Sequence, residues 1–182
     1  LEWLAHHHAC GFSDFLVFSN DCSDGTDLML DRLAAMGWLT HVRNDGPHDE
    51  GPQWSALKAA DSHPLRRQAD WLLFCDIDEF VNIHVGDRTL TALVAALPQA
   101  TAITLTWRLF GNAGVVGIED APVTDTFPRA APARIGWPWR AQMFKTLFAN
   151  TGAYRKLGVH RPRSPDAALM PAQRWFDGSG RA

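Results

Sequence analysis

The run Trp71-Leu72-Leu73-Phe74-Cys75-Asp76-Ile77-Asp78-Glu79-Phe80 joins a short apolar segment to three carboxylates within four residues. Five consecutive apolar residues that end at a charge cluster indicate a buried strand of a parallel sheet. Ligands of open α/β sheets bind just beyond the carboxyl ends of such strands. The run therefore predicts an α/β fold in which Asp76 and Asp78 stand at the rim of a ligand site.

The spacing of the two aspartates indicates a metal ion. Alternate residues of an extended chain point to the same side, so Asp76 and Asp78 are expected to reach one cation or its water shell. Carboxylate oxygens favour magnesium or manganese, which proteins commonly hold with one or two carboxylates and the phosphates of a substrate. A metal and a diphosphate are therefore predicted together. A solvated acidic turn is the alternative, because short motifs also match by chance.

The composition is that of one globular domain, which we expect to cover residues 1–182: 46% of the residues are hydrophobic and the net charge is −3. Cys10, Cys22 and Cys75 have neither a paired framework nor metal-ligand spacing, which favours a reducing, cytoplasmic location. No apolar stretch is long enough to span a bilayer, and no leader-like segment opens the chain. The chain begins without methionine, which indicates a fragment.

The charge is unevenly distributed. Residues 129–182 hold 10 of the 17 Lys and Arg residues but only 2 of the 20 Asp and Glu residues. A basic lobe facing an acidic metal site suits an anionic substrate. Because no nucleic-acid-binding motif accompanies the charge, we expect no nucleic-acid partner. Peripheral association with acidic lipid stays open, and the oligomeric state is not predicted.

Strands and helices alternate along the chain. Strands are predicted at 15–18, 40–43, 71–75, 102–107 and 142–148, and helices at 1–10, 27–37, 54–60 and from Thr89 or Thr91 to Ala96. This alternation indicates parallel strands with helices on both faces. The polar loop at 19–26 offers Ser23 or Asp24 as a helix N-cap. From Gly111 onward glycines and prolines predict a long irregular segment, typical of functional or disordered loops.

Seven short segments carry a resemblance to a known family, and they span nearly the whole chain: residues 2–7, 20–26, 51–53, 71–80, 107–111, 145–146 and 158–162. The sequence resembles glycosyltransferases of the family 2 type, and more closely the branch related to family 92, whose members have the GT-A fold. The resemblance implies a Rossmann-like, mostly parallel sheet flanked by helices. The first strand of that fold is missing from these residues.

The resemblance also implies a donor site. Asp76 and Asp78 correspond to the metal-binding Asp-x-Asp motif, and His160 to the histidine that completes the metal or diphosphate site. The ion would be manganese or magnesium, bridging the donor diphosphate. The residues expected on the nucleotide side are Asn20 and Asp21 in the nucleoside loop, Gln53 near the donor, and Lys145 as a second cation for charge stabilisation. By contrast, His6, His7 and His8 lie on successive faces of a helix and are interpreted as packing and surface residues.

The implied activity is metal-dependent, inverting transfer of a sugar, of the hexosyltransferase kind used in polysaccharide biosynthesis. The donor would be a nucleotide sugar, a UDP-sugar in particular, and the acceptor a glycan or a lipid-linked molecule. Trp107, Arg108, Phe110 and Gly111 are expected to shape the acceptor side. An inverting transferase needs a carboxylate base, for which the candidates are Asp125, Glu119 and Asp120, with Asp125 preferred.

Two other functions are compatible with the same motifs. An apolar strand that ends in Asp-x-Asp also resembles the nucleophile motif of phosphatases of the haloacid dehalogenase type. Phe80 and the two strand–helix steps before the motif fit that class less well. The third possibility is a non-catalytic module that binds nucleotides or sugars.

Overall fold

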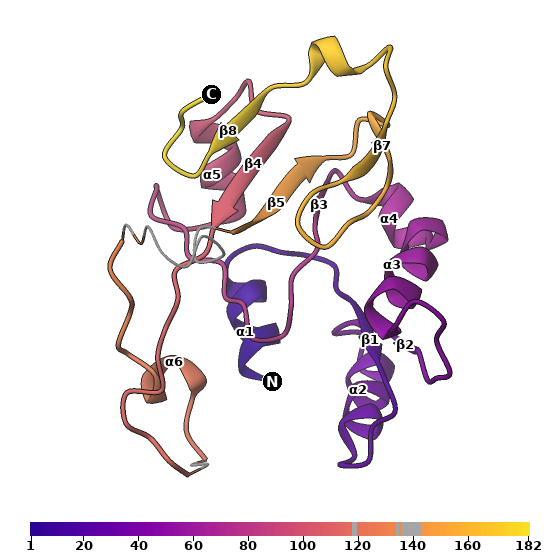
Figure 1. Cartoon of the computed structure of the whole chain (residues 1–182), viewed down its shortest axis with the longest axis vertical. Helices are drawn as coiled ribbons and strands as arrows, with labels where there is room; N and C mark the ends of the chain where they lie inside the picture. Colours follow the sequence, from indigo (N-terminus) through magenta and orange to yellow (C-terminus); the bar gives the residue numbers. More distant parts are fainter. Residues whose placement is uncertain (118–119, 134, 136–142) are drawn as a thin grey trace.

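The computed structural model describes residues 1–117, 120–133, 135 and 143–182 (Figure 1). Its helices are α1 (Glu2–Ala9), α2 (Thr26–Ala35), α3 (Pro52–Ser62), α4 (Pro64–Gln68), α5 (Leu90–Ala96) and α6 (Val123–Thr126), with a 3-10 turn at η2 (Met170–Ala172). Its strands are β1 (Leu16–Ser19), β2 (Thr40–Arg43), β3 (Trp71–Leu73), β4 (Ala102–Thr106), β5 (Phe144–Ala149), β6 (Tyr154–Lys156), β7 (Arg163–Pro165) and β8 (Trp175–Asp177).

The described strands form three sheets. β1 pairs with β2 in parallel, β6 pairs with β7 antiparallel, and the largest sheet has the order β3-β5-β4-β8. In that sheet β5 runs antiparallel to both β3 and β4, whereas β8 runs parallel to β4. The chain is thus a mixed α/β structure, and its described strands do not form the single, mostly parallel sheet that we expected. The parallel order holds for β1 and β2, and the GT-A assignment stays a prediction.

The antiparallel direction of β5 has a local cause. A parallel return from β4 would need a crossover of a dozen or more residues, usually a helix that packs on the sheet. Between β4 and β5 the described residues contain only α6, which has four residues, within the irregular segment that the glycines and prolines predicted. The strand–helix alternation therefore stops after β4, and β5 enters the sheet from the opposite end.

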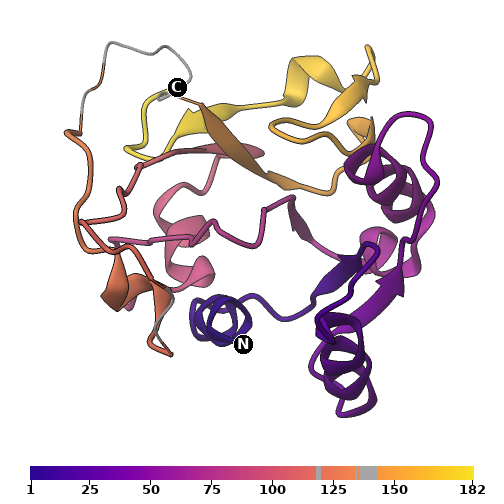
Figure 2. The same cartoon turned by 60° about the horizontal axis from the view of Figure 1, so that its bottom comes forward.

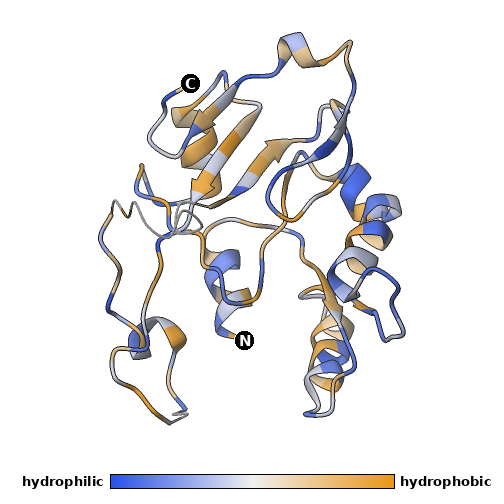
Figure 3. Cartoon of the chain, viewed as in Figure 1, coloured by the Kyte–Doolittle hydropathy of each residue, from blue (hydrophilic) through white to orange (hydrophobic). Residues whose placement is uncertain are grey.

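Helices cover both faces of the four-stranded sheet, as the alternation predicted. Alternate residues of a strand point to opposite faces, so Ala102 and Phe148 pack on one side with Leu57 of α3. Ile103 and Leu147 pack on the other side with Leu93 of α5. Figure 3 shows the hydrophobic colouring of β4 in the sheet and the hydrophilic colouring of α4 at the right-hand edge of the view. A third apolar cluster holds α1 and α2 against β1.

The predicted helix ends are partly right. Gly11 has a φ of 89° just beyond the end of α1, as expected of a residue that terminates a helix. The Oγ1 of Thr89 accepts the Ala92 N–H at 3.2 Å, so Thr89 rather than Thr91 caps α5. Gly25, not Ser23 or Asp24, is the N-cap of α2, although the Asp24 carboxylate still accepts the Thr26 N–H at 3.0 Å.

The predicted strand bounds are close to those observed. The strand expected at 71–75 ends at Leu73, two residues earlier than predicted and three before Asp76, the first acid of the cluster. The one expected at 142–148 is observed as β5, while Gln142 lies outside the described residues. α4, β6, β7 and β8 were not anticipated. In the part of the chain that the structure describes, no helix is both long and apolar enough to cross a membrane.

We predict that Leu147→Ala destabilises the fold by about 2–5 kcal/mol. Leu147 is only 1% exposed and lies on β5 between β3 and β4, so its truncation leaves a cavity in the sheet packing. Urea unfolding followed by far-UV circular dichroism measures the effect. Leu28→Ala is the matched control, since Leu28 is 66% exposed and its loss should change stability by less than about 0.5 kcal/mol. Equal effects of the two substitutions would contradict this assignment of the core.

Candidate functional site

Residues 76–79 form a tight turn that follows β3 after Phe74 and Cys75, and we call it the acid turn. The Glu79 N–H donates to the Asp76 carbonyl at 3.1 Å, and the Glu79 carboxylate accepts the Asp76 N–H at 3.0 Å. The extended geometry expected for Asp76 and Asp78 is therefore wrong, because this local bonding bends the chain at Ile77 and Asp78. Both aspartates still lie at the end of the strand. Asp78 is exposed, and its carboxylate has no partner among the described residues.

A buried lysine lies against the acid turn. Lys145 of β5 is 3% exposed, and its Nζ is 2.8 Å from an Asp76 carboxylate oxygen and 3.4 Å from a Glu79 carboxylate oxygen. The same ammonium lies 4.8 Å from the centroid of the Phe74 ring. A lysine is rarely buried to this extent without charged partners. Glu79, to which the sequence assigned no function, is thus one of the two carboxylates that hold Lys145.

The thiol of Cys75 is partly buried at the same place. Burial, together with the negative charge of Glu79, raises its pKa to about 12, although the ammonium of Lys145 acts in the opposite direction. The Cys75 S–H donates to the Glu79 carbonyl at 3.4 Å. Burial likewise raises the pKa of Cys10, whose S–H donates to the Val81 carbonyl at 3.7 Å. Both thiols therefore contact the backbone of the segment that contains the acid turn.

The predicted nucleoside loop is tied to the loop that follows β2. The Asp21 N–H donates to the Asp45 carboxylate at 2.8 Å, and the Asp21 carboxylate accepts the Gly46 N–H at 3.1 Å. Asp21 adopts a φ of 45°, a left-handed conformation that non-glycine residues seldom take. Asn20 is exposed, and its side-chain oxygen contacts His48 Nε2 at 3.1 Å. The structure thus places Asn20 and Asp21 together on an exposed, hydrogen-bonded rim.

Gln53 contacts the acid turn from the start of α3. Its side-chain amide donates to Asp76 at 3.3 Å from the first turn of α3. The start of α3 is held in turn by Asn44, whose amide donates to the Pro52 carbonyl at 2.9 Å. Hydrogen bonds therefore run from Gln53 through Asp76 to Lys145, so the structure brings these three predicted site residues together.

His160 approaches the sheet from the other side. The Phe144 carbonyl accepts from its Nδ1 at 3.0 Å, the Thr146 hydroxyl donates to its carbonyl at 2.7 Å, and its ring lies edge-on to Trp107 with centroids 5.6 Å apart. Thr146 and Lys145 are neighbours on β5, so their side chains leave opposite faces. Within the described residues His160 makes no contact with Asp76 or Asp78, and its Nε2 has no hydrogen-bond partner.

The candidate bases are only partly placed. Asp125 lies on α6 and is exposed, and Asp120 is also exposed. Glu119 lies outside the described residues. Within the described chain neither Asp120 nor Asp125 contacts the acid turn. On the predicted acceptor side Arg108, Phe110 and Gly111 are exposed, whereas the indole N–H of Trp107 is buried and has no partner among the described residues.

Helix α1 fixes the segment just beyond the acid turn. The Val81 carbonyl accepts from His6 Nε2 at 2.8 Å, and the Val81 N–H donates to His7 Nε2 at 3.3 Å. Since His7 Nε2 accepts, its Nδ1 carries the proton and donates to the Trp3 carbonyl at 2.8 Å. Burial lowers the pKa of His7. His8 is the surface residue that we expected, while the spacing of His6 and His7 gave no sign of this distant backbone pairing.

A second polar cluster has the order of a Ser-His-Asp triad but lacks its accessibility. His41 Nε2 lies 2.8 Å from the Ser19 hydroxyl, and its Nδ1 lies 2.7 Å from the Asp31 carboxylate. A serine nucleophile must meet a substrate. Ser19 is only 5% exposed, whereas Asp31, at the opposite end, is exposed. We interpret the cluster as a hydrogen-bonded connection that joins β1, β2 and α2.

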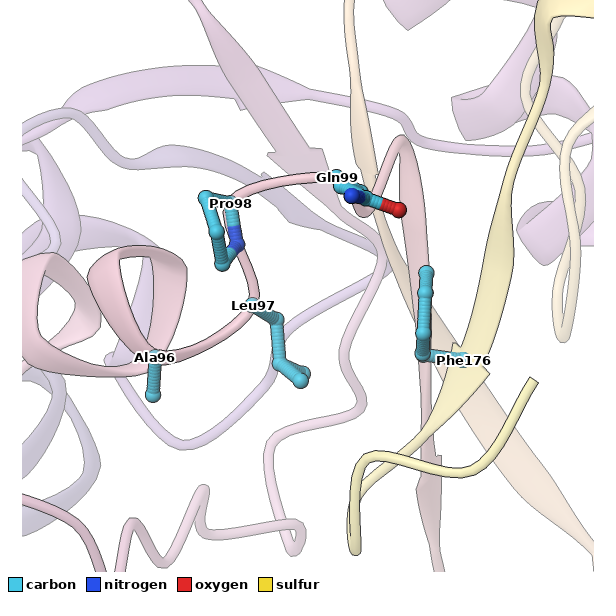
Figure 4. A pocket seen from close by; sticks show the side chains of 5 residues that line it. All are labelled: Ala96, Leu97, Pro98, Gln99 and Phe176. Atoms are coloured by element: carbon cyan, nitrogen blue, oxygen red, sulfur yellow. The ribbon is translucent and has the colours of Figure 1, made fainter.

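Two surface hollows lie away from the acid turn. One, of about 210 Å³, is lined by Ala96, Leu97, Pro98, Gln99 and Phe176 at the end of α5 (Figure 4). The other, of about 370 Å³, is apolar and lies between α1 and α2, where Leu4, Leu33 and Trp38 contribute to its lining. Neither is lined by a predicted site residue. Among the described residues no group of three or more His, Cys, Asp or Glu side chains is arranged to hold a metal ion.

We predict that His7 makes folding stability depend on pH. Because the folded-state pKa is lowered from its ordinary value of 6.5, this contribution is complete above about pH 6.5 and is lost as the pH falls toward the folded-state pKa. His7→Gln should therefore show a smaller fall in Tm than the wild type between pH 7.5 and 5.5. His8→Gln, which alters an exposed neighbour, is the control. A wild-type slope in His7→Gln would contradict the prediction.

Thiol labelling tests the partial burial of Cys75. With a pKa of about 12, only about one thiol in ten thousand is ionised at pH 8, and the thiolate is the reactive form. We expect Cys22 to react first with a disulfide reagent in the folded protein, Cys75 to stay unmodified, and all three cysteines to react in urea. Cys22→Ser should remove the rapid phase. Rapid native labelling in that variant would show that the thiols near the acid turn are accessible.

Comparison with known proteins gives one distant relative. The chain matches no protein-family model and no solved structure. It is similar to a glycosyltransferase family 92 protein of Ricinus communis, with 24% identity over 172 residues, which cover 86% of this chain and 28% of that protein. The chain thus spans less than a third of the length of this relative. The similarity supports the glycosyltransferase class, in agreement with the resemblance to the family 92 branch.

Proposed function

We propose that the chain is the donor-binding part of a metal-dependent glycosyltransferase with a GT-A-like site. The observation that carries the proposal is the acid turn, where Asp78 is exposed and Asp76 is contacted by Gln53 and Lys145. The donor would be a nucleotide sugar, a UDP-sugar in particular. The acceptor would be a glycan or a lipid-linked molecule, and the transfer would be inverting.

The donor set of the acid turn fits a magnesium or manganese ion. Asp76 and Asp78 supply carboxylate oxygens at an exposed rim, and such ions need only one or two carboxylates when substrate phosphates complete their coordination. When bound, the ion would neutralise the charge that builds on the departing nucleoside diphosphate. Asp78 offers a carboxylate that has no partner among the described residues. The Asp76 carboxylate is already oriented by two hydrogen bonds, so its direction is fixed before a ligand arrives.

Lys145 acts through Asp76 in this proposal. Its side chain is only 4% exposed, and its ammonium is taken up by two carboxylates, so it serves to orient Asp76 and offset the charge of the turn. This differs from the direct stabilisation of the diphosphate that we expected for Lys145. His160 is the remaining predicted residue for that contact; its Nε2 has no hydrogen-bond partner among the described residues, and its carbonyl contacts Thr146, on the face of β5 opposite Lys145. Nearby positive charge comes from Arg163, whose guanidinium lies 4.6 Å from the Trp54 ring centroid, next to Gln53.

The remaining predicted residues have proposed functions on either side of the acid turn. Asn20 and Asp21 would contact the nucleoside from their exposed rim. Trp107 and Phe110 would line the acceptor side, where an aromatic face can pack on a sugar ring. Asp125 stays the preferred base on the family resemblance; it is exposed on α6 and would take the proton of the acceptor hydroxyl.

Isothermal titration calorimetry with UDP and manganese tests the proposal. We expect metal-dependent binding that is lost with EDTA and weakened about tenfold or more by Asp78→Ala, which removes the exposed carboxylate. Asp70→Ala is the control, since Asp70 is also an exposed acid close to β3. The proposal fails if the wild type binds no UDP, or if Asp78→Ala binds it equally well.

The same preparation discriminates between the enzyme classes. Hydrolysis of p-nitrophenyl phosphate that disappears in Asp76→Asn would favour the phosphatase alternative. Binding of manganese and UDP without turnover of any UDP-sugar would favour a non-catalytic binding module.

A further inference from the structure

The indole of Trp3 bonds both ends of the acid turn. Its Nε1–H lies 3.1 Å from the carbonyl of Asp76 and 2.9 Å from the carbonyl of Glu79. The ring is itself held, because it lies edge-on to Phe15 with centroids 5.9 Å apart, in the cluster that joins α1 to β1. The turn can therefore rotate away only by breaking both bonds to the indole.

The preceding residue reaches the segment that carries the preferred base. The Glu2 carboxylate accepts the N–H of Val123 at 2.6 Å, the N–H of Thr124 at 3.1 Å and the hydroxyl of Thr124 at 2.7 Å. These groups belong to the first turn of α6, and Asp125 is the next residue. Hydrogen bonds from Thr124 lower the pKa of Glu2. A four-residue helix with no side-chain cap of its own is thus capped by a residue from the start of the chain.

Helix α1 is anchored independently of these two contacts. His6 and His7 hold the Val81 backbone, and the Leu90 N–H donates to the Cys10 carbonyl at 2.7 Å just beyond the end of the helix. Figures 1 and 2 both show α1 lying between α6 and β1. A helix fixed in this way can serve as a common reference for two segments that lie more than forty residues apart in the chain.

We propose that Trp3 and Glu2 are positioning residues that set the acid turn and the Asp125 segment relative to each other. Their Cα atoms are adjacent, about 3.8 Å apart, so the two segments are fixed to neighbouring points of one rigid element. The inference rests on the proposed function, because it gives meaning to the distance between the donor metal site and the acceptor base. It adds that one turn of α1 determines that distance.

Trp3→Phe and its control Trp38→Phe separate an effect on the position of the acid turn from an effect on overall stability. Trp3→Phe keeps an aromatic ring against Phe15 but removes the N–H together with part of the indole, so it should lower the manganese affinity of the UDP complex about three- to tenfold while leaving UDP binding at saturating manganese unchanged. A merely structural effect would lower both. Trp38→Phe is the matched control, since Trp38 is 47% exposed and its indole N–H has no described partner.

Hydrogen exchange measures the two contacts without any ligand. Trp3→Phe should speed amide exchange in residues 76–81 about three- to tenfold and leave residues 121–127 unchanged. Glu2→Ala should speed amide exchange in residues 121–127, leave residues 76–81 unchanged, and leave UDP binding at its wild-type value. Glu2→Gln keeps one carbonyl oxygen and should lie between. Asp70→Asn controls for the loss of one exposed carboxylate.

The outcomes separate a failure of the proposed function from a failure of the positioning inference. If the wild type does not bind UDP in the presence of manganese, the proposed function fails, and the positioning inference, which rests on it, fails as well. If the wild type binds but the UDP complex of Trp3→Phe has the same manganese affinity, only the positioning inference fails. Unchanged exchange at 121–127 in Glu2→Ala would likewise remove Glu2 from the inference.

Discussion

The ion cluster of Lys145, Asp76 and Glu79 is the constraint on which the geometry of the site depends. A lysine side chain that is 4% exposed loses most of the hydration of its ammonium, and the charge is stable there only while carboxylates lie against it. Both carboxylates come from the acid turn, so the need to neutralise one lysine determines where that turn lies. The position of the acid turn then determines where the exposed Asp78 lies. A ligand position at the surface thus depends on a charge balance below it.

Local chemistry explains what the sequence predicted well. The apolar run that ends in acids predicted that Asp76 and Asp78 follow a strand, and both lie just beyond β3, because the change from apolar to charged residues is a local signal. Thr89 was one of the two predicted caps of α5, because capping involves a side chain and an amide three residues away. The helical spacing also identified α1 and α2.

Contacts between distant residues explain what the sequence did not reveal. Lys145 and Asp76 are 69 positions apart, and nothing in either segment shows that the lysine is buried. The pairing of β8 with β4 was missed because a three-residue strand carries no periodicity. The bend of the acid turn follows from a bond between Glu79 and the Asp76 amide, which competes with the extended geometry that the aspartate spacing indicated.

The side chains of β5 point alternately to the two faces of the sheet, so the site depends on the register in which β5 pairs. Lys145 faces the acid turn and Thr146 faces His160, so a shift of β5 by one residue would exchange the two side chains and leave an ammonium where a hydroxyl is needed. β5 finds its register only by pairing with β3 and β4, which precede it by many residues. The acid turn should therefore acquire its charge partner late in folding, after the central sheet has closed.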